Sequence, residues 1–453
     1  MMIKHSAFIF AICLAIVSGQ TQAQNRTRST DKIKIYFNHP VDNSASQIID
    51  AVYTPAFEDT LIAYINSSEV TLDVCNYNTG RLPIVTAINN AQARGVVVRY
   101  IAASTELTNN DELGNLSSAI PMIQRPDDGE IMHNKFIIID AGNAAAATII
   151  TGSTNHVSSS LVNDFNNLVI IHDQPLAQAY KTEFEEMWGS TGNLPDTLNA
   201  KFGAAKTDNT PHQFTIDGIP VELYFSPTDN TTAHIEAAVR TANTDIEFAM
   251  LTYINNDLGD AVIDMKNQGV SCRGIIENIY YIGSEYNGLL SAGVNVLSAF
   301  NQPYFMHHKY CVVDATNTSS DPLVITGSHN WTNSAEEEND ENTLIIHDAE
   351  IANMYLEEFT MRYMELTVGE KEYAADNIRI YPNPTTDNFT IISSNELIES
   401  VRVFDALGRE VFSAVATPCK RFDVQIENVQ SGFFVVKIQL ANGEIVNQKL
   451  LLN

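Results

Sequence analysis

Apolar and polar residues follow one another along this chain in an order that is written twice. Residues 70–75 form a short apolar run, residues 84–95 follow with helical spacing and end in glycine, and residues 96–101 form a second apolar run. The same order returns 174 positions later (244 − 70), over residues 244–249, 258–269 and 270–276. Short apolar runs indicate strands, and a glycine at the end of a helical pattern favours a left-handed C-terminal residue.

Both repeats continue beyond these elements in the same way. The apolar stretch 168–171 and the helical positions after it are matched by residues 344–346 and the helical positions that follow them. Each repeat thus has the order strand, helix, strand, hairpin, strand, helix. This order predicts an α/β fold with two duplicated α/β/α sandwich halves, each built on a mixed sheet, packed face to face about a pseudo-twofold axis.

The pattern changes near residue 377. From there to residue 453, alternating apolar and polar residues are interrupted by turn signals such as Pro382-Asn383-Pro384, which predicts a small all-β sandwich. A polar stretch from about residue 189 to 218 links the two halves. We therefore expect four segments, which are a signal peptide (1–23), a first half (33–190), a second half (218–366) and the β-sandwich (377–453).

The N-terminus has the pattern of a secretory signal peptide. Lys4 and His5 precede an apolar run over residues 7–17, and small residues follow up to Ala23. The run is too short to span a bilayer comfortably. We expect cleavage of residues 1–23 and a soluble, exported protein.

Charge limits the choice of partners. The chain carries 26 Lys and Arg against 55 Asp and Glu, a formal net charge of −29. A field of this sign repels polyanions unless a local basic groove overrides it, and the sequence has no such groove.

A chemical motif lies at the same place in each repeat. It consists of a His-x-Lys triplet, four further residues, an Asp, and later Gly-Ser-x-Asn. Matching residues of the two copies are 174 (307 − 133) or 175 (328 − 153) positions apart. The first copy has His133, Lys135, Asp140, Ser153 and Asn155, and the second has His307, Lys309, Asp314, Ser328 and Asn330. One such triplet would be a coincidence, whereas two ordered copies indicate one site built from two halves.

These residue types suit phosphoryl transfer. Residues i and i+2 of a strand point to the same face, so each histidine projects beside its lysine. One histidine can attack phosphorus while the other protonates the leaving oxygen. The lysines, serines and asparagines would hold the phosphate oxygens, so we expect no cofactor and no metal.

This residue set resembles the paired His-x-Lys-x4-Asp motifs of the phospholipase D superfamily, and the resemblance covers about residues 34–366. It implies a covalent phosphohistidine with His133 as nucleophile, while His307 protonates the leaving group and later activates water. It also makes Asp140 and Asp314 second-tier catalytic candidates, since the Asp of each motif is usually structural or orients a histidine. Glu341 and Asn342 would be a supporting pair, where the first half has Asn166 and Asn167. The chain departs from the family in the longer segments between Asp and Gly-Ser, which we expect to lengthen a hairpin.

The tail has a resemblance of its own. Tyr381-Pro-Asn-Pro384, the segment 401–409 and the segment 431–437 resemble the C-terminal sorting domain of the type IX secretion system of Bacteroidota. The alternative is a generic carbohydrate-binding or adhesion sandwich. The resemblance implies that the type IX machinery is a partner and that the protein is secreted or attached to the cell surface.

Three functions remain open from the sequence. The leading hypothesis is a monomeric phospholipase D that hydrolyses phospholipid head groups, because a zwitterionic lipid needs no basic platform. Apolar residues near the second motif, at 279–282 and 303–306, could then make transient contact with a membrane surface; the alternative is ordinary core or loop packing. The runner-up is a nonspecific endonuclease of the same superfamily, which the charge disfavours. The third is a catalytically inactive surface-binding protein, which the complete motif set disfavours.

Overall fold

The computed structural model describes residues 30–104, 110–300 and 302–373, and most of residues 378–452. In this last part the residues 384, 387, 395, 406–409, 427–431 and 442–444 are left out. The expected signal peptide lies outside the described residues.

The first repeat forms a mixed sheet of seven strands in the order β1-β7-β6-β5-β2-β3-β4. Its strands β2, β3 and β4 are parallel, and the other pairs are antiparallel. The strands are β1 (Ile33–Phe37), β2 (Thr71–Asn76), β3 (Val97–Ala102), β4 (Met122–Gln124), β5 (Lys135–Ile139), β6 (Thr148–Gly152) and β7 (Asn167–Ile171). The helices are α1 (Phe57–Ser67), α2 (Leu82–Ala93) and α3 (Gln174–Trp188).

The second repeat forms a sheet with the same order, β12-β11-β10-β13-β14-β15-β9, and one added edge strand, β8. Its strands are β8 (Gln213–Ile216), β9 (Ile219–Ser226), β10 (Asp245–Met250), β11 (Ser271–Ile276), β12 (Asn295–Ser298), β13 (Lys309–Val313), β14 (Leu323–Gly327) and β15 (Glu341–Ile346). Its helices are α4 (Thr231–Val239), α5 (Asn256–Asn267), α6 (Tyr286–Ser291), α7 (Asn333–Glu337) and α8 (Ala349–Tyr373). The predicted duplication of an α/β half is therefore confirmed in the strand order itself.

Local sequence signals set the ends of several helices. Asp173 accepts a hydrogen bond from the Leu176 backbone amide at the start of α3, and Asn255 does the same for Leu258 at the start of α5. Gly95 and Gly269 follow α2 and α5 with φ of 97° and 98°, a region that favours glycine.

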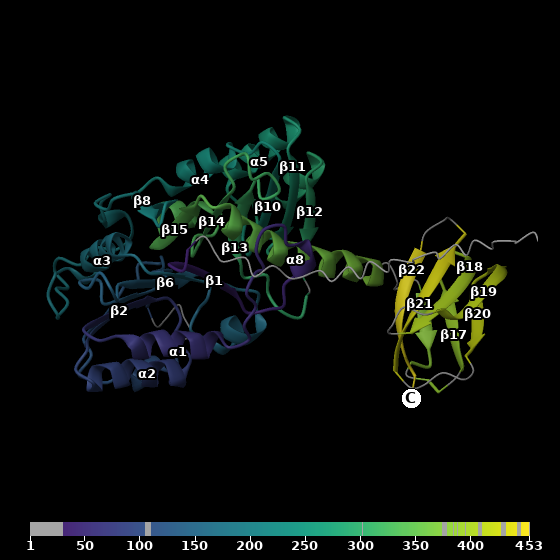
Figure 1. The fold of residues 1–453 in the computed structure, drawn as a ribbon, viewed down its shortest axis with the longest axis horizontal. Helices are drawn as coiled ribbons and strands as arrows, with labels where there is room; N and C mark the ends of the chain where they lie inside the picture. The colour runs from purple at the N-terminus through teal and green to yellow at the C-terminus, as the bar shows by residue number, and fades with distance from the viewer. Residues whose placement is uncertain are drawn as a thin grey trace, which may run out of the picture.

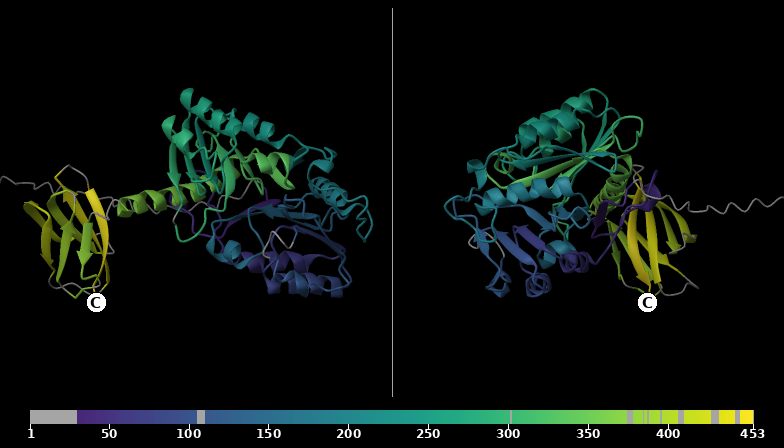
Figure 2. Two further views of the ribbon diagram at one scale, coloured as in Figure 1. Left: turned by 180° about the vertical axis from the view of Figure 1, so that it is seen from behind. Right: turned by 60° about the vertical axis from the view of Figure 1, so that its left-hand side comes forward.

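The two halves stack face to face (Figures 1 and 2). Helices α1 and α2 cover the outer face of the first sheet, and α4 and α5 cover the outer face of the second, while α3 and α8 lie between the sheets. One hydrophobic core runs through this middle layer and takes in the inner faces of both sheets, from Phe136 to Tyr310. Burial of this shared apolar surface fixes the halves against each other.

Buried ion pairs add to this contact. Arg125 of the first half lies 2.9 Å from the Asp340 carboxylate of the second. Lys206, on the link between the halves, lies 2.5 Å from Glu183 and 3.1 Å from Asp340. Since each charge is buried with an opposite charge, loss of one partner would leave a costly unpaired group.

The C-terminal domain stands apart at the end of α8 (Figures 1 and 2). It has sheets of three and four strands, β16-β17-β20 and β19-β18-β21-β22, around its own core, as the alternation predicted. The strands are β16 (Ile378–Tyr381), β17 (Asn388–Ser393), β18 (Ile398–Asp405), β19 (Glu410–Cys419), β20 (Arg421–Gln425), β21 (Gly432–Leu440) and β22 (Ile445–Leu452).

In the described part of the chain, no helix has both the length and the apolar character that a bilayer crossing requires.

Candidate active site

Each His-x-Lys triplet lies at the start of a central strand. Strand β5 begins at Lys135 and pairs with β2, and β13 begins at Lys309 and pairs with β10. The Nζ atom of each lysine donates back to the carbonyl of its own histidine, at 2.7 Å from Lys135 to His133 and 2.8 Å from Lys309 to His307. Each lysine side chain therefore bends back toward the histidine that precedes it.

The two triplets meet where the halves touch. The His133 amide donates to the Asp340 carbonyl at 2.9 Å, and the Phe165 amide donates to the Phe305 carbonyl at 2.9 Å. Both contacts join one half to the other, and they lie within two residues of His133 and of His307. The duplication thus brings the two triplets into one site.

Each histidine takes its hydrogen-bond partner from the other half. The Nδ1 atom of His133 lies 2.8 Å from both carboxylate oxygens of Glu341. The Nδ1 atom of His307 lies 2.8 Å from the amide oxygen of Asn166. Both histidines therefore carry the Nδ1 proton toward their partner, which leaves each Nε2 atom free to act on a substrate.

The two partners differ in charge. Burial of Glu341 opposes its ionisation, but attraction to His133 and Lys135 outweighs burial and keeps the pKa of this carboxyl below its usual value. Glu341 is therefore an anion that can stabilise positive charge on His133, whereas the amide of Asn166 is neutral. The site is symmetric in shape and asymmetric in charge.

Burial and the nearby cations keep both histidines uncharged. Burial lowers the pKa of His133 to about 4, with Glu341 opposing the change. Burial, followed by the charges of Lys309 and Lys135, lowers the pKa of His307 well below its usual value. Neutral imidazoles with free Nε2 atoms are competent nucleophiles or bases.

The pKa values of both lysines are also lowered. Burial lowers the pKa of Lys135 to about 7, although Glu341 opposes it, and burial and Lys135 lower the pKa of Lys309 well below its usual value. Two buried ammonium groups in one site form a strong attraction for an anion, and the anion in turn would restore their ordinary pKa values.

The Gly-Ser-x-Asn segments follow β6 and β14. Gly152 and Gly327 have φ of 126° and 148°, and a Cβ atom at Gly327 would lie 2.2 Å from the Asn342 carbonyl oxygen. Only glycine allows this close approach to the neighbouring strand. The serines then hold that strand in place, because Ser153 donates to Asn166 at 2.8 Å and Ser328 accepts from the Asn342 amide at 3.0 Å.

The asparagines of these segments are free to meet a ligand. The Oδ1 atoms of Asn155 and Asn330 are buried and have no hydrogen-bond partner among the described residues. A buried polar group without a partner is costly, so these amides are poised for a ligand. The second residue of the expected supporting pair, Asn342, instead has its own partners, Asn134 at 2.9 Å and Thr151 at 2.8 Å.

Asp140 and Asp314 do not join the histidines, and the expectation of a catalytic part for them needs correction. Asp140 lies at the far end of β5, roughly 16 Å from Lys135 at the rise of a β-strand. Its carboxylate accepts hydrogen bonds from the backbone amides of Glu69, Val70 and Thr71 at 2.7–2.8 Å. Asp314 binds the equivalent amides of Asn243 and Thr244. Both aspartates therefore anchor the strand beside them.

The sequence interpretation missed Tyr77. Its ring meets His133 edge-on, with centroids 4.7 Å apart, and lies 5.0 Å from the Nζ atom of Lys135. The equivalent position in the second half, 174 residues on, is Leu251. A repeat-based search overlooks such a residue because the two copies differ there.

The middle residues of the triplets were also missed. Asn134 binds Asn342, and the Nδ1 atom of His308 lies 3.2 Å from the Asn167 amide nitrogen, so each contacts the other half. The Nε2 atom of His308 lies 3.1 Å from Glu358, which in turn lies 3.4 Å from Arg362. These residues connect the site to helix α8.

Among the described residues, one group of side chains could hold a metal ion. Atoms of Asp208, His212 and Asp229 lie within 4.8 Å of one another. They stand on and beside the link between the halves. His212 is already hydrogen-bonded to Asp208 at 3.0 Å and to the Leu223 carbonyl at 2.9 Å. None of the three belongs to the histidine and lysine site.

Comparison with known proteins relates both parts of the chain to families. The family described as "Cardiolipin synthase, PLD-like domain" matches residues 61–188 and 235–363. The family described as "Secretion system C-terminal sorting domain" matches residues 379–453. Both resemblances drawn from the sequence are confirmed.

Individual relatives cover single parts of the chain. A mitochondrial cardiolipin hydrolase of Xenopus tropicalis is 36% identical over 140 residues, 30% of this chain and 63% of that protein. The Mus musculus protein of the same name is 33% identical over 144 residues, 31% of this chain and 61% of that protein. The chain thus spans less than two thirds of the length of these relatives. A solved structure, the phospholipase D family member Nuc from Salmonella typhimurium, is 25% identical with a TM-score of 0.28, covering 32% of this chain and 93% of that one.

Proposed function

Because the chain belongs to the phospholipase D-like family through both of its repeats, we propose that it is an exported phosphodiesterase that cleaves the head-group phosphodiester bond of phospholipids. The observation that carries this proposal is the crossed pairing of His133 with Glu341 and of His307 with Asn166. It supplies two histidines of unequal character around two buried lysines.

The unequal partners assign the two roles. The Nε2 atom of His133 forms the bond to phosphorus, and Glu341 stabilises the positive charge that the ring then carries. The bond from phosphorus to the head-group oxygen breaks, and His307 gives its Nε2 proton to that oxygen. The anionic substrate supports protonation of His307, because it offsets the charges of Lys135 and Lys309 that lower the pKa of this histidine.

Water completes the cycle. His307, now neutral, takes a proton from water, whose oxygen binds phosphorus while the bond to His133 breaks. The products are phosphatidic acid and the free head-group alcohol. Lys135 and Lys309, with the amides of Asn155 and Asn330, hold the non-bridging oxygens throughout. These roles need no metal ion.

The substrate class is supported by charge and by relatives. A net charge of −29 disfavours the many phosphate contacts that nucleic-acid binding uses. Hydrolases named for the phospholipid cardiolipin are among the similar proteins. The sorting-domain match implies export, and we propose the type IX machinery as the partner and a secreted or surface-attached monomer as the product. The expected domain boundaries and the signal peptide stay predictions.

One experiment tests this function. The purified mature protein is incubated in EDTA with phosphatidylcholine vesicles and, separately, with plasmid DNA. We expect choline release with intact DNA, and loss of release in both His133→Ala and His307→Ala. DNA cleavage without choline release would establish the endonuclease instead, and a rate abolished by EDTA would refute the metal-free chemistry.

A further inference from the structure

Beside the site, the second half carries a group of exposed apolar side chains. They come from two loops, the segment 277–285 after β11 and the described residues 299–300 and 302–306 after β12. We call Tyr280, Tyr281, Ile282, Phe300, Tyr304 and Phe305 the apolar rim. Ile282 is 99% exposed, Tyr280 is 72% exposed, and Tyr281 and Phe305 are each more than half exposed.

Strand register places the rim next to the reacting residues. Met250 of β10 pairs with Lys309 on one side and with Ile276 on the other, and Ile276 pairs with Ser298 of β12. With neighbouring strands about 4.8 Å apart, the first loop leaves the sheet roughly 10 Å from Lys309. The second loop ends at Met306, and His307 is the next residue of the chain.

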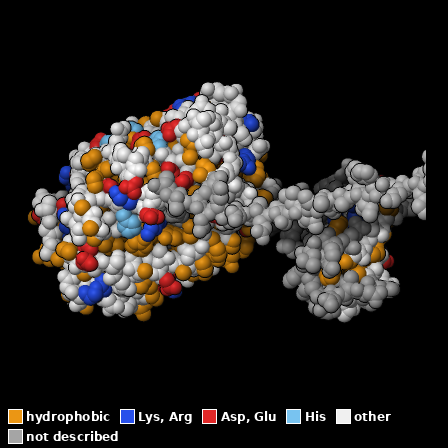
Figure 3. All heavy atoms as spheres, in the orientation of Figure 1, with side chains coloured by type: hydrophobic (Ala, Val, Ile, Leu, Met, Phe, Trp, Pro, Cys, Tyr) orange, Lys and Arg blue, Asp and Glu red, His pale blue; other side chains and the backbone are white. Residues whose placement is uncertain are grey.

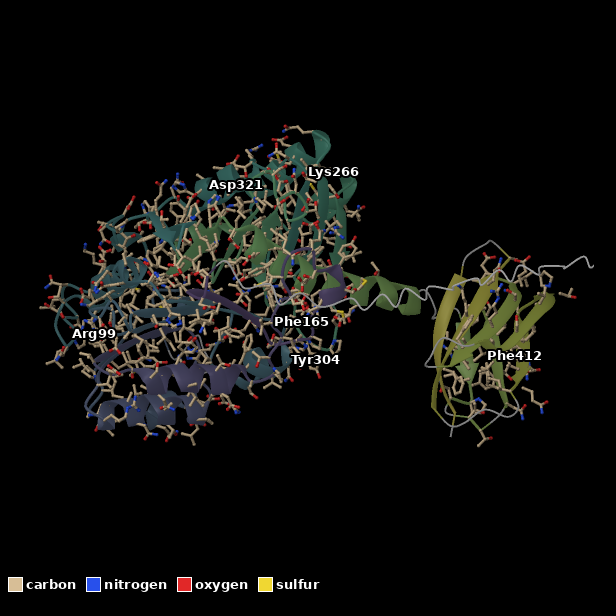
Figure 4. All side chains as sticks on the ribbon, viewed as in Figure 1. Arg99, Phe165, Lys266, Tyr304, Asp321 and Phe412 are labelled. Carbon is tan, nitrogen blue, oxygen red and sulfur yellow. The ribbon has the colours of Figure 1, made fainter. Side chains whose placement is uncertain are left out.

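Contacts within the rim hold these loops together. The Met306 amide donates to the Glu277 carboxylate at 2.9 Å, and the rings of Tyr280 and Phe300 meet edge-on with centroids 4.7 Å apart. Tyr304 lies near His39, which packs on Phe165 of the first half. Figure 4 shows Phe165 and Tyr304 close together where the halves meet, and Figure 3 shows hydrophobic side chains spread over the same part of that face.

Exposed aromatic and aliphatic side chains at loop tips indicate a binding surface, and their charge indicates the partner. Residues 279–306 contain no Lys or Arg. The equivalent loop of the first half, which precedes His133, is acidic at Asp127, Asp128 and Glu130. Arg125 of that loop is buried and paired with Asp128 and Asp340, so a polyanion would find no exposed cation in either loop. An uncharged or zwitterionic surface would meet no repulsion there.

We propose that the apolar rim docks on the surface of a zwitterionic phospholipid bilayer and so presents head groups to the site; this rests on the proposed function. Amphipathic aromatic rings favour the boundary between head groups and acyl chains. With the apolar rim at this boundary, the scissile phosphate would lie beside His133 and His307, because it lies at the same depth as the head groups.

The test uses the full mature protein and the double variant Tyr281→Ser/Ile282→Ser. Both side chains are exposed and neither belongs to the reacting set, so folding should be unaffected. Leu198→Ser is the matched control, since Leu198 is 94% exposed on the link between the halves. Binding is measured by sedimentation with phosphatidylcholine vesicles and with vesicles rich in phosphatidylglycerol. Turnover is measured on those vesicles and on a short-chain phosphatidylcholine below its micellar concentration.

We expect the wild-type protein to bind phosphatidylcholine vesicles. In the double variant, binding to these vesicles and turnover on them should each fall by about 10-fold or more, because two large side chains are no longer buried in the bilayer surface. Turnover of the short-chain lipid should be unchanged, and Leu198→Ser should match the wild type. Equal vesicle binding by the double variant would overturn the proposal, as would binding confined to the anionic vesicles.

The same measurements separate the rim from the chemistry. Vesicle binding that depends on the rim, without any choline release, would refute the lipase function and leave the docking surface in place. Release from the short-chain lipid with rim-independent vesicle binding would refute the docking surface and leave the lipase function in place.

Discussion

Glu341 and Asn166 stand at equivalent positions, 175 residues apart, yet they offer their histidines different acceptors. A carboxylate stabilises an imidazolium far better than an amide does, because the charge is whole and the site is buried. In the mechanism that we propose, this single difference separates the roles of two otherwise equivalent histidines. Chemistry at the residue scale therefore depends on a departure from the repeat.

Replacement of Glu341 tests this assignment. In Glu341→Gln we expect kcat to fall by about 10²- to 10⁴-fold, as in other removals of a carboxylate that orients a reacting histidine. KM should change little, because Glu341 contacts His133 and not the phosphate. Steady-state kinetics with the short-chain lipid provide both values.

Glu358→Gln is the matched control, since Glu358 is another buried glutamate paired with a histidine, His308. It should reduce the free energy of unfolding and leave kcat near the wild-type value. A Glu341→Gln enzyme with unchanged kcat, or with a change in KM alone, would contradict the proposed role.

The buried lysines predict a pH dependence. The pKa of Lys135 is lowered to about 7 by burial, so its charged form exists below that pH and is lost as the pH rises through it. We expect kcat/KM, which reports the free enzyme, to decline above about pH 7. The decline in kcat should begin at higher pH, because the bound phosphodiester raises the pKa of both lysines. Two coincident alkaline limbs, or a flat profile to pH 9, would contradict this expectation.

At the scale of elements, Asp140 and Asp314 connect the ends of β5 and β13 to the segments that begin β2 and β10. Each has a left-handed backbone, with φ of 48° and 54°, and each carboxylate accepts several backbone amides. The strands that carry the triplets are thereby held at the end opposite to the site.

Asp140→Ala should therefore lower the free energy of unfolding by about 2–4 kcal/mol, since three backbone amides lose their buried carboxylate acceptor. Asp140→Asn should cost less, because asparagine keeps one acceptor oxygen and tolerates the left-handed conformation. Denaturant unfolding measures both. At low temperature the kcat of the folded variants should stay within about twofold of the wild type. A large loss of kcat at full stability would instead restore a catalytic part for Asp140.

At the scale of the whole molecule, much of the architecture could be predicted from the sequence. The offset of 174 residues between His133 and His307 also separates the matching strands, glycines and helices of the two repeats. The duplicated halves and their shared site could therefore be predicted from it. The crossed pairing of Glu341 with His133 could not, because it depends on how one half docks on the other. Tyr77 was missed since Leu251 breaks the repeat there, and Asp140 was misjudged because its backbone partners lie 69–71 residues away.

The crossed pairing also has a consequence for inheritance. Neither half holds a complete set of reacting groups and supports, so a substitution in one half is selected through its effect on the other. We therefore expect a chimaera with one half taken from a relative to lose the difference between its two histidines, unless the new half also carries the matching Asn166 or Glu341.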